Sequence, residues 1–120
     1  MLNLKQFMPQ SQINALKAMI RCNESTCFAI ELTENIKKQI AKTPKLYETE
    51  EQENPIAMLH YFGGSYDAYI TERGENGDAF GWASFGYGFE AGYISIDELI
   101  QNGIELDLYH EPAPIKDFIK

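Results

Sequence analysis

The spacing of the apolar residues changes once along this chain, and that change restricts the fold to one class. Ile13, Leu16 and Ile20 recur at helical intervals, which predicts an amphipathic helix from about Gln10 to Arg21. From Pro55 onward the period becomes two, as it does in β-strands. A chain of 120 residues has room for one well-packed core. We therefore expect a single α+β domain, residues 1–120, with its helices before its strands.

A second helix is expected after Thr33, whose hydroxyl could cap the helix N-terminus. Ile36 and Ile40 would share one face of it, and Thr43-Pro44 would end it. The stretch between the two helices, Cys27 to Leu32, fits either a short strand or a turn, and the pattern does not choose between them.

The second half of the chain has the pattern of an antiparallel meander. The alternating run from Ile56 to Phe62 predicts a strand, residues 63–65 predict a turn, and Tyr66 to Thr71 predicts the partner strand. The aromatic run from Ala79 to Tyr87 predicts a third strand, whose register the glycines at 81, 86 and 88 leave open.

The last part of the chain predicts one short helix and the end of the sheet. Ser95 and Glu98 have the spacing of a capping box that opens a helix, which Asn102-Gly103 would close. Ile104 to Tyr109 alternates as an edge strand does, and the tail from Pro114 predicts a last helical turn. The expected architecture is an antiparallel sheet of three to five strands with the N-terminal helices packed on one face and a short capped helix near residue 96.

The charged residues are segregated along the chain. Residues 1–45 hold seven Lys/Arg and three Glu, net +4, whereas residues 46–120 hold three Lys/Arg and fifteen Asp/Glu, net −12. The overall charge of −8 argues against direct nucleic-acid binding and against an anionic membrane surface as partner. We expect a host protein with a basic surface, such as a nucleic-acid-binding effector.

The candidate partner-binding residues are carboxylates of this acidic half. Four of them form a dense segment, namely Glu48, Glu50, Glu51 and Glu53. The others are dispersed: Glu72, Glu75, Asp78, Glu90, Asp97, Glu98, Glu105, Asp107 and Glu111. Together they could present negative charge as the phosphates of a DNA duplex do, and so compete with DNA for a basic site. The alternative is an ordinary solvated acidic surface.

Two histidines could take part in chemistry, and both also have a structural interpretation. His60 lies in an apolar strand run, where we favour a hydrogen-bonded histidine of the core or of a sheet face. His110 has Asp107 and Glu111 nearby, and these residue types can bind a divalent metal. Strand alternation would place Asp107 and His110 on opposite faces, so we predict no metal site. No nucleotide-binding motif occurs, and we predict neither a cofactor nor catalytic residues.

The N-terminus and the cysteines indicate a reducing compartment. Met1 to Phe7 lacks the features of a signal peptide, and no apolar stretch reaches the length of a membrane span. Cys22 and Cys27 have neither a second pair nor the spacing of a redox motif, which is typical of spare thiols. We expect a soluble protein of the cytoplasm.

Aromatic residues are concentrated in the acidic half. They could form a base-stacking platform, but such platforms lie in basic grooves, and this half is strongly acidic. We expect most of them in the core, with some tyrosines and Trp82 exposed as anchors of a protein interface.

From about Leu32 to the C-terminus, the order of several motifs resembles a bacterial family, domain of unknown function 2958. The matching segments are Leu46-Tyr47-Glu48-Thr49-Glu50, Pro55-Ile56-Ala57, Tyr66 to Tyr69, Phe80-Gly81-Trp82, Gly92 to Leu99 and Asp107-Leu108-Tyr109. Leu106 stands where the family tends to have an arginine, and His110 where it tends to have an aromatic residue. Residues 1–31 would be a helical addition to a family-like α+β core at 32–120.

The resemblance implies a genetic context more than a reaction. Similar proteins occur on plasmids, phages and other mobile elements, sometimes beside antirestriction genes, and none of the motifs has an established catalytic role. With the charge pattern, this predicts a small acidic binding protein that inhibits a DNA-targeting defence system, as an anti-CRISPR or antirestriction protein does. The alternatives are a small metal-dependent hydrolase or nuclease, and a subunit of a larger assembly that docks through Ile13, Leu16 and Ile20.

Overall fold

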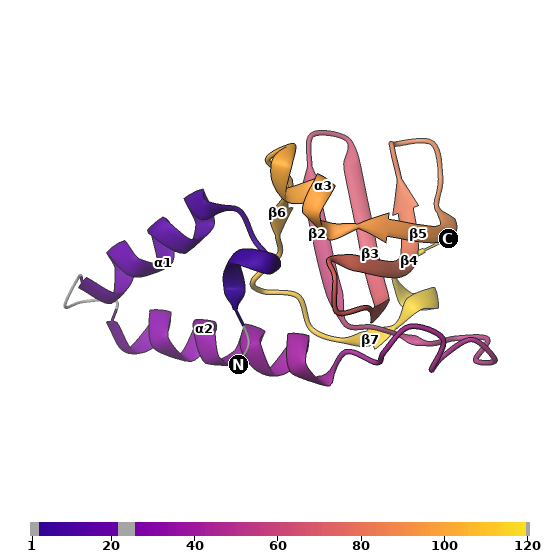
Figure 1. The fold of residues 1–120 in the computed structure, drawn as a ribbon, viewed down its shortest axis with the longest axis horizontal. Coiled ribbons are helices and arrows are strands. Elements are labelled where there is room, and N and C mark those ends of the chain that lie inside the picture. The colour runs from indigo at the N-terminus through magenta and orange to yellow at the C-terminus, as the bar shows by residue number, and fades with distance from the viewer. Residues whose placement is uncertain (1–2, 22–25, 120) are drawn as a thin grey trace.

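The computed structural model describes residues 3–21 and 26–119, and it places a helical hairpin beside an antiparallel sheet (Figure 1). A 3-10 turn, η1 (Leu4–Gln6), leads into α1 (Gln10–Arg21), which has the predicted bounds. α1 packs against α2 (Thr26–Lys42), and the two helices extend away from the β6 edge of the sheet. No helix of the described segments is long and apolar enough to cross a membrane.

The second helix begins earlier than its sequence pattern predicted. It starts at Thr26, so Cys27 to Leu32 is helical, neither strand nor turn. The Thr33 hydroxyl donates to the Ala29 carbonyl inside the helix (2.8 Å) and does not cap an N-terminus. Ala29 is fully buried and continues the stripe of Ile36 and Ile40, and burial of that longer stripe outweighs the weak preference of threonine for a cap.

Five strands form the main sheet, and all neighbouring pairs are antiparallel. These are β2 (Leu59–Gly63), β3 (Tyr66–Arg73), β4 (Asp78–Ser84), β5 (Glu90–Ser95) and β6 (Glu105–Leu106), in the order β5-β4-β3-β2-β6. The α+β prediction is therefore confirmed. The strand expected from Ile56 to Phe62 is divided: β1 (Ile56–Ala57) leaves the main sheet and pairs with β7 (Ala113–Pro114).

The β2–β3 hairpin and the short helix follow their local signals. Gly64, with a φ of 57°, occupies the β2–β3 turn, a conformation that costs glycine little. α3 (Ile96–Gln101) starts where predicted, because the Ser95 hydroxyl accepts the Glu98 N–H (3.2 Å). The tail forms the 3-10 turn η2 (Ile115–Asp117). The third strand ends at Ser84 and does not reach Tyr87.

A β-bulge in β3 changes which side chains share a face of the sheet. Ile70 pairs with Gly81, but the next pair joins Glu72 to Phe80, so one residue of β3 is extra. Since Phe80 and Trp82 of β4 face the same side, the bulge turns Glu72 toward that side too. The sheet also closes tightly here, because a Cβ atom at Gly81 would overlap the Tyr69 carbonyl oxygen.

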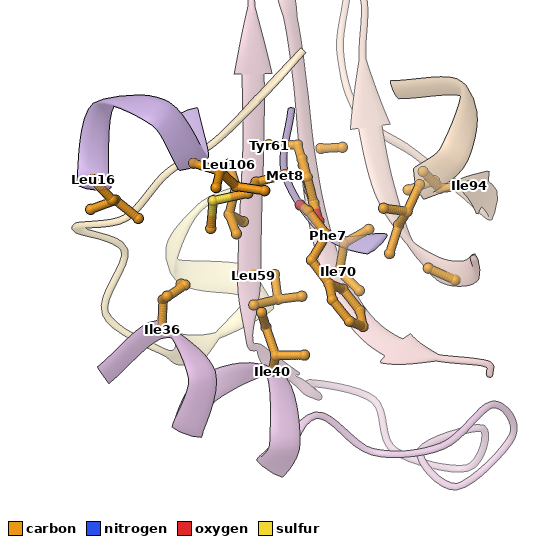
Figure 2. Packing of buried hydrophobic residues seen from close by; sticks show 14 residues of the cluster. Phe7, Met8, Leu16, Ile36, Ile40, Leu59, Tyr61, Ile70, Ile94 and Leu106 are labelled. Carbon is orange, nitrogen blue, oxygen red and sulfur yellow. The ribbon is translucent and has the colours of Figure 1, made fainter. Parts of the chain in front are cut away.

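One face of the sheet carries the core, shown in Figure 2. Leu59, Tyr61 and Ile70 of the sheet meet Ile36 and Ile40 of α2 in a single buried cluster. The N-terminal residues expected as an addition contribute to the same cluster: Phe7, Met8, Ile13 and Leu16. The helices therefore meet the sheet on this one face, as predicted, next to its β6 edge, and the opposite face of the sheet remains outside this core.

Two buried polar contacts attach the N-terminal segment to the sheet. The Tyr61 hydroxyl donates to the Phe7 carbonyl, and burial raises the pKa of Tyr61 above its usual range. The Gln12 amide group donates to the Leu106 carbonyl and accepts the Leu106 N–H, each at 2.8 Å. Gln12 of α1 thus satisfies the backbone of the edge strand β6, where another strand would otherwise pair.

Candidate functional site

The face of the sheet that points away from the core is rich in aromatic side chains. His60, Tyr69 and Trp82 occupy neighbouring register positions on β2, β3 and β4, and Phe80 and Tyr93 pair beside them. These side chains are partly or largely exposed. Two of the cavities in the described structure involve this face, one beside the acidic segment and one beside the C-terminal turn.

The acidic segment, which we define as residues 48–53, displays its charge as predicted. Glu48, Glu50, Glu51 and Glu53 are all exposed. The dispersed residues that share this exposure are Glu75, Asp78, Glu90, Asp97, Glu98, Glu105 and Glu111. Across residues 3–21 and 26–119, no lysine or arginine forms an ion pair with any of these carboxylates. Their negative charge is therefore not neutralised within the described part of the molecule.

The exposed carboxylates do not form one continuous face. Glu90 lies on β5 and Glu105 on β6, which are the two opposite edges of the sheet. The acidic segment instead follows α2 beside the end of β3, where Lys45 bridges to Arg73. Among the residues that the structure describes, only the acidic segment concentrates four exposed carboxylates within a few positions.

Two of the candidate partner-binding residues have structural roles. Glu72 is only 4% exposed, so the expectation that it displays charge to a partner is wrong. Its carboxylate accepts the Tyr47 N–H (2.7 Å), the Thr49 N–H (2.9 Å) and the Thr49 hydroxyl. Asp107 is half-buried and bonded to a histidine. The bulge in β3 explains the burial of Glu72, because it turns this carboxylate beneath the start of the acidic segment.

The cavity beside the acidic segment is an aromatic pocket of about 290 Å³. Tyr47, Phe80, Trp82 and Tyr93 line it together with Glu50. The Phe80 ring packs edge-on against the rings of Trp82 and Tyr93, with centroids 5.9 and 5.6 Å apart. We call this cavity the aromatic pocket.

The wall of the aromatic pocket is held by unusual local structure. Tyr47 has a φ of 74°, a left-handed conformation that a non-glycine residue adopts only when its surroundings enforce it. Glu72 supplies that constraint through the Tyr47 N–H. The Tyr93 hydroxyl donates to the Tyr47 hydroxyl (3.0 Å), and this hydrogen bond raises the pKa of Tyr93.

The second cavity contains a histidine cluster, His60, Asp107 and His110. One ligand atom of each residue lies within 4.8 Å of the other two. The prediction that strand alternation separates Asp107 from His110 is wrong, because β6 ends at Leu106 and the chain turns at once. The Asp107 side chain accepts the Tyr109 N–H (2.9 Å), and this turn returns His110 to the same side.

His60 is a hydrogen-bonded histidine of the sheet face, one of the two interpretations favoured from the sequence. Its Nδ1 faces the Asp107 carboxylate at 3.0 Å, and its Nε2 faces the Asp67 carboxylate at 2.9 Å. The Asp107 N–H also donates to the His60 carbonyl (2.7 Å), so backbone and side chain hold the pair together. Asp67, which sequence reasoning missed, is placed by the β2–β3 register.

Aromatic rings enclose the histidine cluster on one side. Tyr69 is stacked between His60 and Phe118, with centroid distances of 4.4 and 4.7 Å. His110 is buried, and its Nε2 lies 2.7 Å from the Ala57 carbonyl. Burial lowers the pKa of His110, so the neutral imidazole is favoured. The adjoining cavity, about 540 Å³, opens to solvent past Glu111 and Asp117.

Cys27 contributes to neither cavity. Cys27 lies exposed on α2, whereas Cys22 falls outside the described residues.

No protein-family model, no curated protein and no solved structure matches this chain. The resemblance to domain of unknown function 2958 stays a prediction.

Proposed function

We propose that this protein is a small acidic binding protein that captures a basic surface of a host protein through the acidic segment and the aromatic pocket. The observation that carries the proposal is their juxtaposition: Glu50 of the exposed acidic segment lines a pocket together with four aromatic side chains. The remaining lining residues are Thr49, Gln52, Pro55, Thr71 and the buried Glu72. A partner's lysine or arginine would place its charge over the rings and near the carboxylates.

The size and the charge of the site favour a side chain over a larger ligand. At about 290 Å³, the aromatic pocket lies at the lower end of small-molecule sites. Carboxylates of the acidic segment lack internal ion pairs in the described structure, so a cation from outside meets no competing lysine or arginine. The negative charge of the acidic segment also speeds association with a basic partner.

The partner class follows from charge and from the resemblance. A surface that binds DNA phosphates is basic, and residues 46–120 of this protein carry a net charge of −12. We therefore propose a nucleic-acid-binding effector of a DNA-targeting defence system as the partner, with the protein encoded by a mobile element. Occupation of the effector's basic site would block DNA from it.

Replacing Glu48, Glu50, Glu51 and Glu53 together by glutamine is expected to weaken partner binding on the order of tenfold or more, because the rim charge is lost. The measurement is affinity capture from bacterial lysates that contain defence systems, repeated with duplex DNA as competitor and with raised salt. A matched control replaces four exposed glutamates elsewhere, Glu31, Glu75, Glu90 and Glu105, by glutamine. Equal loss in both variants would show a general charge effect and exclude the acidic segment as the site.

The aromatic pocket is expected to report its own occupation, because Trp82 in its wall is the only tryptophan of the chain. An arginine-rich peptide should change the Trp82 fluorescence in a saturable way, and the four-glutamine variant of the acidic segment should reduce the apparent affinity. A peptide of the same length with glutamine in place of arginine is the control. A signal that is the same for both peptides contradicts cation recognition in this pocket.

The two other candidate functions differ in their support. A metal-dependent hydrolase is favoured by the histidine cluster, which groups two imidazoles and a carboxylate beside an open cavity. Docking of the first helix to a neighbouring subunit has less support, because Ile13 and Leu16 are already buried in the protein's own core.

A further inference from the structure

We propose that the histidine cluster is a binding site for one divalent transition-metal ion of the zinc type, with His60, Asp107 and His110 as protein ligands. This inference is independent of the acidic segment and the aromatic pocket, which belong to another cavity.

The donor set fits such an ion. Two imidazole nitrogens and one carboxylate oxygen lie within 4.8 Å of one another, so a small movement of the side chains brings all three to a common centre. Imidazole and carboxylate are the ligands of many three-residue zinc sites, in which a fourth position stays open. Calcium and magnesium prefer oxygen ligands and suit this set poorly.

The second nitrogen of each histidine is held by an acceptor outside the cluster. His60 Nε2 lies 2.9 Å from Asp67, and His110 Nε2 lies 2.7 Å from the Ala57 carbonyl. Each acceptor selects the tautomer with hydrogen on Nε2 and leaves Nδ1 as the ligand atom. Carboxylates and carbonyls in this position orient the histidines of known metal sites. Within residues 3–21 and 26–119, His110 Nδ1 makes no hydrogen bond.

The charges around His60 also call for a cation at this point. Its two nitrogens face two carboxylates, Asp67 and Asp107, and the tautomer that donates from Nε2 to Asp67 turns the Nδ1 lone pair toward the Asp107 carboxylate. A divalent ion between His60 Nδ1 and Asp107 would bind that lone pair and the carboxylate together, and would also use the free nitrogen of His110. The exposed Glu111 and Asp117 at the mouth of the cavity add favourable negative charge.

The cavity supplies the remaining coordination position. It reaches the cluster from solvent and is lined on one side by Tyr69 and Phe118. A water molecule or a small anionic group could therefore bind the ion there, as in sites where zinc activates water.

The test is titration of the full chain, first dialysed against a chelator, with Co²⁺ and then with Zn²⁺. We expect one Co²⁺ per chain, visible absorption bands of a site with nitrogen and oxygen ligands, displacement by Zn²⁺, and a raised melting temperature. Asp107→Asn and His60→Gln should each lower the affinity at least tenfold. Asp67→Asn, which affects only the orientation of His60, should lower it roughly 10- to 100-fold.

Controls separate this site from other ways of binding the ions. Glu111 and Asp117 line the same cavity, and Glu111→Gln and Asp117→Asn should each change the affinity about twofold or less. These substitutions alter only the electrostatic potential at the site and remove no ligand. Cys22→Ser with Cys27→Ser should not change it. Unchanged affinity in Asp107→Asn, or loss only in the cysteine variant, overturns the proposal. Each variant is checked for a native circular dichroism spectrum, and an undiminished response of Trp82 to the arginine-rich peptide shows that the other cavity is intact.

If neither Co²⁺ nor Zn²⁺ binds at micromolar concentrations, the proposal is rejected. The contacts of the cluster then only stabilise the position of the turn after β6 against β2. In that case Asp107→Asn should still lower the melting temperature without any metal, because the contact with His60 is lost.

Discussion

Glu72→Ala is expected to lower the free energy of unfolding by about 3 kcal/mol, because it removes the acceptor of several hydrogen bonds at a buried position. The Tyr47 and Thr49 N–H groups donate to this carboxylate at 2.7 and 2.9 Å, and the Thr49 hydroxyl donates to it as well. Without Glu72 these donors lose their partner, and Tyr47 loses the backbone hydrogen bond that favours its left-handed conformation. The wall of the aromatic pocket should loosen as a result.

Urea unfolding, followed by Trp82 fluorescence and by circular dichroism, measures this loss. Glu75→Ala is the matched control, since Glu75 is an exposed glutamate in the turn that follows β3, and its change should stay within about 0.5 kcal/mol. Glu72→Gln keeps one acceptor oxygen and should fall between the two. If Glu72→Ala is as stable as the control, the carboxylate does not hold the segment. A stable Glu72→Ala variant that also binds the arginine-rich peptide normally would remove Glu72 from the account of the pocket.

Gly81→Ala is expected to destabilise the protein by about 3 kcal/mol, although alanine is the smallest possible addition. The new Cβ would overlap the Tyr69 carbonyl oxygen and press on the backbone at Ile70, which cannot move aside as a flexible side chain can. Relief of the overlap requires β3 and β4 to separate beside the bulge, at the centre of the sheet. The cost therefore comes from backbone hydrogen bonds and from the packing of both strands.

Gly92→Ala is the control for this substitution, because Gly92 pairs directly with Gly81 on the neighbouring strand. A Cβ atom at Gly92 meets no atom within 4 Å, so its effect should stay within about 0.5 kcal/mol. Equal midpoints of urea unfolding for the two variants would mean that β3 and β4 can separate at little cost. A specific loss in Gly81→Ala would also be expected to reduce the response of Trp82 to the peptide, since Trp82 follows Gly81 on β4.

Local signals in the sequence were sufficient for the elements that depend on near neighbours. The first helix has its predicted bounds because its apolar residues recur regularly, and α3 begins at Ser95 because its cap lies within one turn. The start of α2 was missed because Thr33 resembles a cap, whereas the buried Ala29 that extends the helix has little sequence signal.

The candidate sites show the same division. Exposure of the acidic segment could be predicted, since consecutive glutamates are rarely buried. The burial of Glu72 could not be predicted, because it depends on one extra residue in β3. That residue changes the face of the sheet toward which the Glu72 side chain points. The histidine cluster contradicts the strand pattern, which places Asp107 and His110 on opposite faces. That pattern does not apply here, because the strand ends at Leu106.

The sequence by itself determined the class of the fold, its order of helices and strands, and the excess of negative charge in the second half, because periodicity and composition are properties of the chain alone. Only the tertiary structure decided which side chains meet: Glu72 beneath Tyr47 and Thr49, Glu50 beside the aromatic pocket, and His60 beside Asp107 and His110. These contacts join residues far apart in the sequence, and they depend on strand register, a bulge and the end of an edge strand. Each of these is set by packing of the whole sheet against the helices, which no local pattern specifies.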